Sequence, residues 1–307
     1  MIFQTNLPGE AAALVDDTDI FSHPTPMTTF NRKLNPALAD ISFIPFTEAH
    51  LDAGLNLSTA AGWAHRREDW EMLLPFSKGV VAVHASGVVG TGFRADFGEV
   101  STVTMIIVSR EMRSRGLGRA LTTAAIGETD QSLRLVATVS GMPLYQKLGF
   151  ETVGTITCLQ GVVETVGDAG AATTATADDM PAIASLESES FGGDRAALVG
   201  WMETHARFAV IRDAGCARAY AACRPFGVGH VIGPIVAPSL EDAQALVAYL
   251  ARDLVGQVLR LDVAETSGLQ PGLAAMGLTK SYPAPIMQRG PSAARQDRLA
   301  FASQALV

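Results

Sequence analysis

Cysteines are scarce in this chain of 307 residues, and none of them is spaced like a metal ligand. Cys158, Cys216 and Cys223 form no C-x-x-C pair, and the six histidines are scattered along the sequence. Structural zinc sites need cysteine and histidine at short, fixed spacings. We therefore expect free thiols and no metal site.

Charged residues and long hydrophobic runs are also limited. Charged residues make up 18% of the chain, and 31 acidic residues outnumber 23 basic ones, which gives a net charge of −8. No basic run with interleaved aromatic residues is present to attract a phosphate backbone, so no nucleic-acid partner is expected. No segment approaches the roughly 18 uninterrupted apolar residues that span a bilayer, and residues 1–40 lack the basic start of a secretory signal. We therefore expect no membrane association, which leaves the cytoplasm as the expected location.

The sequence does have enough apolar material for two cores. Hydrophobic residues make up 48% of the chain, and at about 100–200 residues per domain its length predicts two domains. Residues 167–176 are small and flexible, as in an interdomain linker. The expected division is an N-terminal extension (1–40), a first domain (41–165), a linker (166–177), a second domain (178–290) and a C-terminal tail (291–307).

The first domain has the pattern of a mixed α/β sheet flanked by helices. A β-branched run over residues 101–108 leads through a glycine-containing turn into a helix over about residues 119–128. Further expected elements are a helix over 51–57, a hairpin over 80–94, strands over 133–138 and 150–159, and a short helix over 143–148 that Pro143 opens. This order predicts a mixed, mostly antiparallel sheet.

The same order of elements returns 128 residues later. When the chain is shifted against itself by this amount, a turn glycine, a strand end, a helix-start proline and a post-helix glycine coincide without a gap. Such a repeat indicates a duplicated domain, so the fold class is α/β with two similar domains in tandem. The coinciding pairs are Gly87 and Gly215, Val108 and Val236, Pro143 and Pro271, and Gly149 and Gly277.

One loop of the first domain has the composition of a ligand-binding loop. Residues 113–119, with the sequence RSRGLGR, lie between a strand end and a helix start. Glycines there let the backbone approach a ligand, and the free N–H groups of a helix start suit an anion such as pyrophosphate. The loop lacks the P-loop pattern, and Leu121 stands where the dinucleotide fingerprint needs its third glycine.

A second motif, read together with this loop, points to a known family. Residues 143–150, with the sequence PLYQKLGF, follow a strand, and together with R-x-x-G-x-G they resemble the GCN5-related N-acetyltransferase (GNAT) superfamily. The segment GWAHRREDW over residues 62–70 is similar to that of a subgroup with two such domains in tandem. The resemblance implies a sheet splayed between its fourth and fifth strands, with acetyl-CoA lying in the gap. The residues it assigns to acetyl-CoA are Ile107 and Val108 for the pantetheine arm, and Arg113, Ser114, Arg115, Gly116, Leu117, Gly118 and Arg119 for the pyrophosphate.

The resemblance also suggests catalytic and acceptor residues. Tyr145 matches the position that protonates the departing thiolate, with a packed helix tyrosine as the alternative. The base is either Glu99, near the start of the long strand, or His65; a solvated strand-end charge and a capped loop residue are the alternatives. The acceptor pocket is expected to involve Trp63, His65, Arg66 and Trp70, although simple core packing of the two tryptophans is the alternative.

The second domain differs at the positions that matter for acetyl-CoA. The counterparts of Arg113, Gly116, Gly118 and Tyr145 are Glu241, Gln244, Leu246 and Leu273. A carboxylate and bulky side chains there predict that the second domain binds no acetyl-CoA.

We expect an acetyl-CoA-dependent N-acetyltransferase that acts on a primary amine of a small molecule. The alternatives are a protein or peptide N-acetyltransferase and a non-catalytic acyl-CoA sensor. The oligomeric state is left open, with a homodimer among the alternatives.

Overall fold

The computed structural model describes residues 36–281, 283–291 and 298–307. Most of the expected N-terminal extension lies outside these residues. Its described part contains a short 3₁₀ helix, η1 (Pro36–Leu38), whose Leu38 is buried against the first half of the chain.

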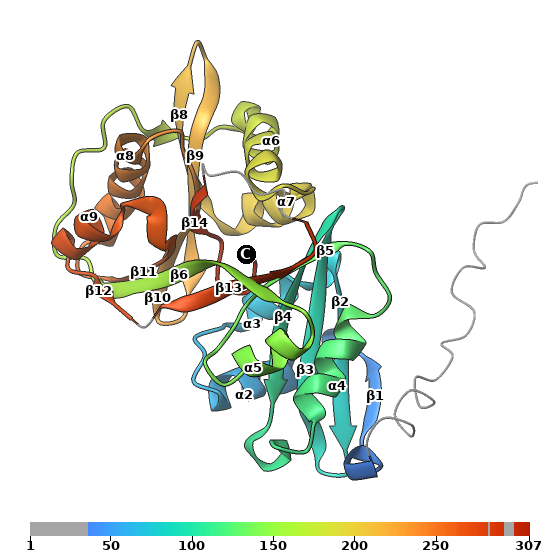
Figure 1. The fold of residues 1–307 in the computed structure, drawn as a ribbon. Helices are drawn as coiled ribbons and strands as arrows, with labels where there is room; N and C mark the ends of the chain where they lie inside the picture. The colour runs from blue at the N-terminus through green and yellow to red at the C-terminus, as the bar shows by residue number, and fades with distance from the viewer. Residues whose placement is uncertain (1–35, 282, 292–297) are drawn as a thin grey trace, which may run out of the picture.

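The described strands form one continuous sheet. Its order is β1-β2-β3-β4-β5-β13-β6-β11-β14-β10-β9-β8-β7, and β12 pairs with β6 outside this path (Figure 1). The strand neighbours are mostly antiparallel, and helices lie on the sheet faces, so the expected fold class is confirmed.

The first half of the chain builds one end of this sheet. The expected helix over residues 119–128 and the hairpin over 80–94 are both present, with shifted ends. The strands are β1 (Ser42–Pro45), β2 (Ser77–His84), β3 (Gly87–Phe97), β4 (Val100–Val108), β5 (Ser132–Val136) and β6 (Glu151–Val162), and the α-helices are α2 (Leu51–Ala60), α3 (Arg67–Glu71), α4 (Leu117–Ile126) and α5 (Met142–Lys147).

The second half repeats this order. The short helices α5 and α9 coincide under the shift of 128 residues, because 142–147 maps onto 270–275. The strands are β7 (Thr173–Thr174), β8 (Arg207–Asp213), β9 (Cys216–Phe226), β10 (Gly229–Val236), β11 (Val258–Ala264), β12 (Thr279–Lys280), β13 (Ala284–Arg289) and β14 (Arg298–Phe301), and the α-helices are α6 (Met180–Phe191), α7 (Ala196–His205), α8 (Leu240–Ala251) and α9 (Gln270–Ala275). Helix α7 was not expected from the sequence.

The two halves exchange their late strands. Strand β13 pairs with β5 of the first half, while β6 pairs with β11 of the second half, and the two exchanged strands lie side by side at the centre (Figure 1). The division at residues 166–177 therefore separates the two repeats in sequence but not in strand pairing.

The segment expected as a C-terminal tail is also part of the sheet. Strand β14 lies between β10 and β11 and pairs with both, and Ala302, Leu306 and Val307 beyond it are almost fully buried. The tail expectation is corrected here because the sheet offers this segment two partner strands that are distant in sequence.

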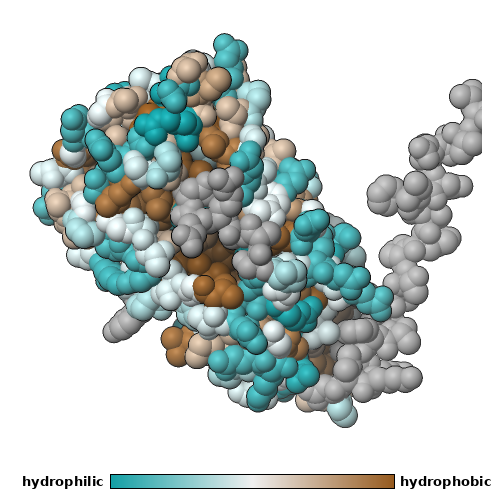
Figure 2. All heavy atoms as spheres, turned by 45° about the horizontal axis from the view of Figure 1, so that its top comes forward, coloured by the Kyte–Doolittle hydropathy of each residue, from teal (hydrophilic) through white to brown (hydrophobic). Residues whose placement is uncertain are grey.

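The largest core cluster joins the halves. Helices α6 and α7 of the second half pack with strands of the first, and Phe97 of β3 contacts Phe191 of α6 with ring centroids 5.1 Å apart. On the face shown in Figure 2, hydrophilic residues dominate the outer edge and hydrophobic ones gather toward the middle. Burial of this shared core holds the two halves in a fixed arrangement.

Candidate functional site

Strands β4 and β5 open a gap in the first half. They are parallel and pair only between residues 100–102 and 132–134. Strand β3 continues to pair with β4 as far as Val108. The backbone of residues 103–108 therefore has a partner strand on the β3 side and faces the gap on the other.

A bulge in β4 lies at this gap. Met105 has a positive φ of 50°, and the β3–β4 register shifts between Thr91 and Phe93. Val100 and Met105 point into the same core cluster although five residues separate them, which regular alternation forbids. The buried Thr91 hydroxyl donates to the Met105 carbonyl oxygen at 2.8 Å and holds the bulge in place.

This bulge could not be predicted from the sequence, because methionine seldom adopts a positive φ. Strained backbone conformations of this kind cluster at active sites and ligand-binding segments.

The glycine-containing loop follows directly after β4. Gly116 has a φ of 85° and lies just before α4, whose first turn receives no side-chain cap. Arg113, Arg115 and Arg119 are exposed around it. Uncapped N–H groups, the helix dipole and three guanidinium groups are each features that favour an anion.

Gly118 has a different status from Gly116. A Cβ atom built on it meets only the methyl groups of Leu144 and Val108, each at 3.8 Å, and its φ is not positive. Nothing in the described fold therefore requires a glycine at this position.

Tyr145 lies at the base of the gap. It is 8% exposed and packs in one cluster with Val103 of β4 and with Leu135 and Ala137 at the end of β5. Burial raises the pKa of its phenol to about 12. Its hydroxyl makes no hydrogen bond within residues 36–281, 283–291 and 298–307, so it has donor capacity for a ligand.

His65 lies where the halves meet. Its ring contacts Trp63 at 5.6 Å and Phe226 of β9 at 5.8 Å between centroids. Burial lowers the pKa of His65 to about 4; the Asp69 carboxylate opposes this shift, and nearby guanidinium groups add to it. The imidazole is therefore neutral at physiological pH, and its buried Nδ1 has no partner among the residues described.

A buried ion pair stands beside this histidine. Asp69 accepts from the backbone N–H of Arg66 at 2.7 Å and pairs with Arg224 of β9, and both charged side chains are 3% or less exposed. An isolated buried charge is costly, so each group depends on the other. This pair fixes the segment 62–70 against the second half.

The expected acceptor residues fall into two groups. Trp70 is completely buried, stacks on Phe46 at 5.7 Å and donates Nε1–H to the Ser58 hydroxyl, so it belongs to the core. Trp63 and Arg66 are partly exposed in the same loop as His65. The contacts that Phe226 and Arg224 make with this loop were not predicted, since both residues come from the other half.

Glu99 lies away from the other expected catalytic groups. It is exposed in the turn between β3 and β4, and its carbonyl oxygen accepts from Ser132 N–H at 2.9 Å. At 3.3 Å per residue it is about 20 Å along the strand from the bulge at Met105. The structure does not bring Glu99 and Tyr145 together.

The second half closes the corresponding gap. Strand β14 pairs with Val236 and Ile235 of β10 and with Asp262 and Val263 of β11, so it fills the space that is open between β4 and β5. Gly233, the counterpart of Met105, lies so close to Phe301 that a Cβ would be 2.0 Å from its carbonyl oxygen.

The counterpart of the pyrophosphate loop is also changed. Helix α8 starts at Leu240, so residues that correspond to the first half's loop form its first turn. Ser239 Oγ accepts from Asp242 N–H at 3.1 Å and occupies a donor that is uncapped in α4. Both changes remove features that an anion would use.

The described residues contain neither a metal-binding cluster nor a membrane-spanning helix. No cluster of three or more His, Cys, Asp or Glu side chains is arranged to hold a metal ion in the part of the chain that the structure describes. No helix among the described residues is long and apolar enough to cross a membrane.

Comparisons with known proteins agree with the fold. Two family models described as "Acetyltransferase (GNAT) domain" match residues 63–165 and 183–302. The "Uncharacterized N-acetyltransferase YitH" of Bacillus subtilis is 28% identical over 254 residues, which cover 80% of this chain and 90% of that protein.

Solved structures share the architecture at low identity. A putative acetyltransferase from Pyrococcus horikoshii has a TM-score of 0.73 at 15% identity, covering 87% of this chain and 96% of that one. A tandem GNAT protein from the clavulanic acid biosynthesis pathway has a TM-score of 0.57 at 17% identity, covering 82% and 99% respectively. With its two matched domains, this chain belongs to the GNAT acetyltransferases and is an acyltransferase with two GNAT domains in tandem.

Proposed function

We propose that the protein is an acetyl-CoA-dependent N-acetyltransferase that acetylates a primary amine of a small molecule by direct attack in a ternary complex. The open gap between β4 and β5, beside the uncapped and arginine-rich start of α4, carries this proposal. The second half lacks both features, so we propose one acetyl-CoA site per chain.

The first-half loop fits the phosphates of acetyl-CoA. The backbone N–H groups of residues 114–119 and the guanidinium groups of Arg113, Arg115 and Arg119 would bind the pyrophosphate. The backbone of Ile107 and Val108, which faces the gap, would pair with the amides of the pantetheine arm. This pairing replaces the strand partner that β4 lacks there.

Tyr145 is the group we assign to the leaving sulfur. The amine nitrogen forms the new C–N bond, the C–S bond breaks, and a proton lost by nitrogen has to end on sulfur. With a pKa of about 12, Tyr145 stays protonated at physiological pH. It donates its hydroxyl proton to the thiolate and regains one from the nitrogen, so the protein is unchanged after each cycle.

The acceptor side is proposed to be the loop with Trp63, His65 and Arg66. Trp63 packs on the core cluster that also contains Met105 and Ile107, so this loop lies on the sheet face opposite α4. A histidine with a pKa of about 4 is a weak base, and Glu99 is distant. We therefore propose that the amine enters in its neutral form and that His65 accepts a hydrogen bond from it.

The test is release of free CoA from acetyl-CoA across a panel of small primary amines, with peptides carrying free N-termini as a second panel. At least one small amine is expected to give turnover that saturates with amine concentration. Binding of acetyl-CoA without CoA release in either panel would favour a sensor, and turnover with peptides alone would refute the small-molecule acceptor.

A variant pair tests the role of Tyr145. Tyr145→Phe is expected to lower kcat by about 10²–10⁴-fold while leaving the Kd for acetyl-CoA nearly unchanged. Tyr249→Phe on α8, which removes an exposed hydroxyl bonded to Thr174, is the matched control and should keep full turnover. Unchanged kcat in Tyr145→Phe would assign Tyr145 to packing.

A further inference from the structure

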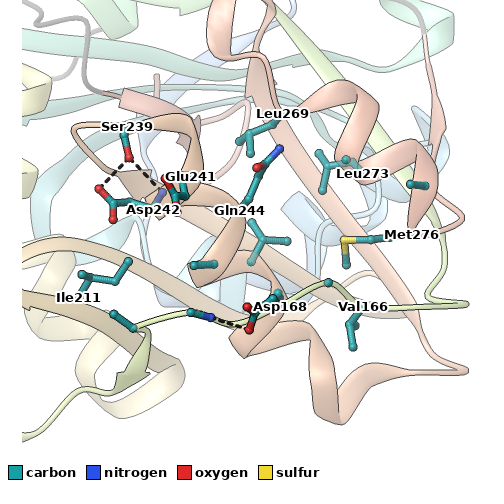
Figure 3. Close-up of a pocket in the computed structure, with 18 of the residues that line it drawn as sticks. Val166, Asp168, Ile211, Ser239, Glu241, Asp242, Gln244, Leu269, Leu273 and Met276 are labelled. Carbon is teal, nitrogen blue, oxygen red and sulfur yellow. Dashed lines mark hydrogen bonds between the residues drawn. The ribbon is translucent and has the colours of Figure 1, made fainter.

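The second half keeps a groove beside α8 and α9, which correspond to α4 and α5 of the first half, although the gap between its strands is closed. The groove lies between α8, α9 and residues 165–171 and has a volume of about 900 Å³ (Figure 3). Ligand pockets of about 300–1,000 Å³ hold small organic molecules.

The groove is the duplicate of the pyrophosphate region with its charge reversed. Under the shift of 128 residues, Glu241 takes the place of Arg113 and Asp242 that of Ser114. Four ionisable side chains line the groove, three carboxylates and one guanidinium: Asp168, Glu241, Asp242 and Arg218. Arg218 is occupied by two hydrogen bonds of 2.7 Å to Asp242.

The two remaining carboxylates have no cationic partner in the described structure. Glu241 is exposed at the start of α8, and Asp168 is exposed in the segment that crosses the groove, where it accepts from Gly170 N–H at 3.0 Å. Ser239 already caps the α8 start and occupies the Asp242 N–H, so an anion finds one donor fewer at that end. The charge therefore favours a cation.

The rest of the lining is apolar. Figure 3 shows Leu269, Leu273 and Met276 on the α9 side, Val166 below them, and Glu241 and Asp242 at the other end of the groove. Leu273 replaces Tyr145 and removes the hydroxyl that the first half offers there. A ligand with a hydrocarbon body and one charged end matches this division.

We propose that the α8–α9 groove binds a small organic ammonium ion, with its charged end near Glu241 and its hydrocarbon part against Leu269, Leu273 and Met276. The duplicated nucleotide groove has become a separate amine-binding site. This assignment does not depend on acetyl transfer by the first half, because the test measures binding alone.

The probes are n-hexylammonium, n-hexanol and hexanoate, titrated into the full chain and followed by ligand-observed NMR. Hexylammonium is expected to bind at least about tenfold more tightly than hexanoate, and added salt should weaken only the ammonium. Hexanoate or hexanol binding as tightly as hexylammonium would overturn the proposal.

One variant fills the groove and locates the binding. A Cβ on Gly272 of α9 would meet only the flexible Gln244 amide, at 3.4 Å, so Gly272→Phe projects a ring into the groove without a backbone clash. It should abolish the hexylammonium binding described above. Gly200→Phe, on an exposed face of α7 with nothing within 4 Å of the added Cβ, is the matched control.

A second variant tests the charge. Glu241→Gln is expected to weaken hexylammonium binding about two- to fivefold, as for removal of one exposed charge. Glu203→Gln on α7 removes an exposed carboxylate elsewhere and should have no effect. If Gly272→Phe and Glu241→Gln both bind hexylammonium like the unaltered chain, any bound amine lies elsewhere, in the acceptor pocket of the first half, and the groove assignment is refuted.

Discussion

The fold does not require a glycine at position 118, whereas the proposed acetyl-CoA site does. A Cβ there meets no atom closer than 3.8 Å, and the residue lies in the first turn of α4 with ordinary helical geometry. Alanine is a better helix former than glycine by up to about 1 kcal/mol. Gly118→Ala should therefore leave the free energy of unfolding unchanged or raise it slightly.

A charged side chain at the same position should instead weaken the binding of acetyl-CoA. Gly118→Glu places a carboxylate in the space proposed for the pyrophosphate. Two unit charges of like sign 4 Å apart repel by about 4 kcal/mol at an effective dielectric constant near 20. That corresponds to about a thousandfold increase in the Kd for acetyl-CoA.

The assay is calorimetric titration of acetyl-CoA into the full chain, beside urea unfolding of the same samples. Gly200, in the middle of α7, is the matched control because a Cβ there meets nothing within 4 Å. Gly200→Glu should keep the Kd, whereas Gly118→Glu should lose binding with its stability intact. Normal affinity in Gly118→Glu would refute the position of the phosphate site.

Further predictions concern the junction of the halves. His65 has its pKa lowered from 6.5 to about 4 by burial, so the unfolded chain takes up the proton first and stability is lost as pH falls from 6.5 to 4. The loss of stability is about 3 kcal/mol, at about 1.36 kcal/mol per pKa unit. Urea unfolding at pH 7 and 4.5 should show that His65→Gln reduces this dependence of stability on pH. In the same assay, Asp69→Asn should lower the free energy of unfolding by about 3–5 kcal/mol, because it leaves Arg224 unpaired. Asp69→Leu combined with Arg224→Met should lower it much less. Equal losses would contradict a dependence of each charge on the other. Because β13 pairs only with strands of the first half, residues 170–307 expressed alone should be insoluble and should become soluble when co-expressed with residues 36–169; a soluble, cooperatively unfolding second half would refute this.

The sequence was sufficient for features that depend on nearby residues. Helix α4 and the loop before it follow from glycine, arginine and apolar residues within ten positions of one another, and their form is set by local backbone preference. The duplication was readable because each copy kept its own turn glycines and helix-start proline.

Contacts between distant residues were not readable in this way. The sequence assigned Trp70 to an acceptor pocket, but the structure buries it against Phe46 and Phe93. Helix α7 was missed because its apolar residues pack against the first half of the chain. They therefore do not follow the pattern expected of a helix that packs within its own repeat. The bulge at Met105 was missed because the residue type disfavours the conformation it adopts.

By itself the sequence determined the order of elements, their repetition and the glycine- and arginine-rich composition of the loop before α4. Only the tertiary structure decided which copy has an open gap, because β14 closes the second gap through backbone hydrogen bonds to strands that lie 35 or more residues earlier in the chain. The same holds for the exchange of β6 and β13 and for the low pKa of His65, which depends on burial where the two halves meet. Local sequence sets backbone preferences, whereas pairing and burial are fixed by whichever distant segments satisfy the same backbone groups and apolar surfaces.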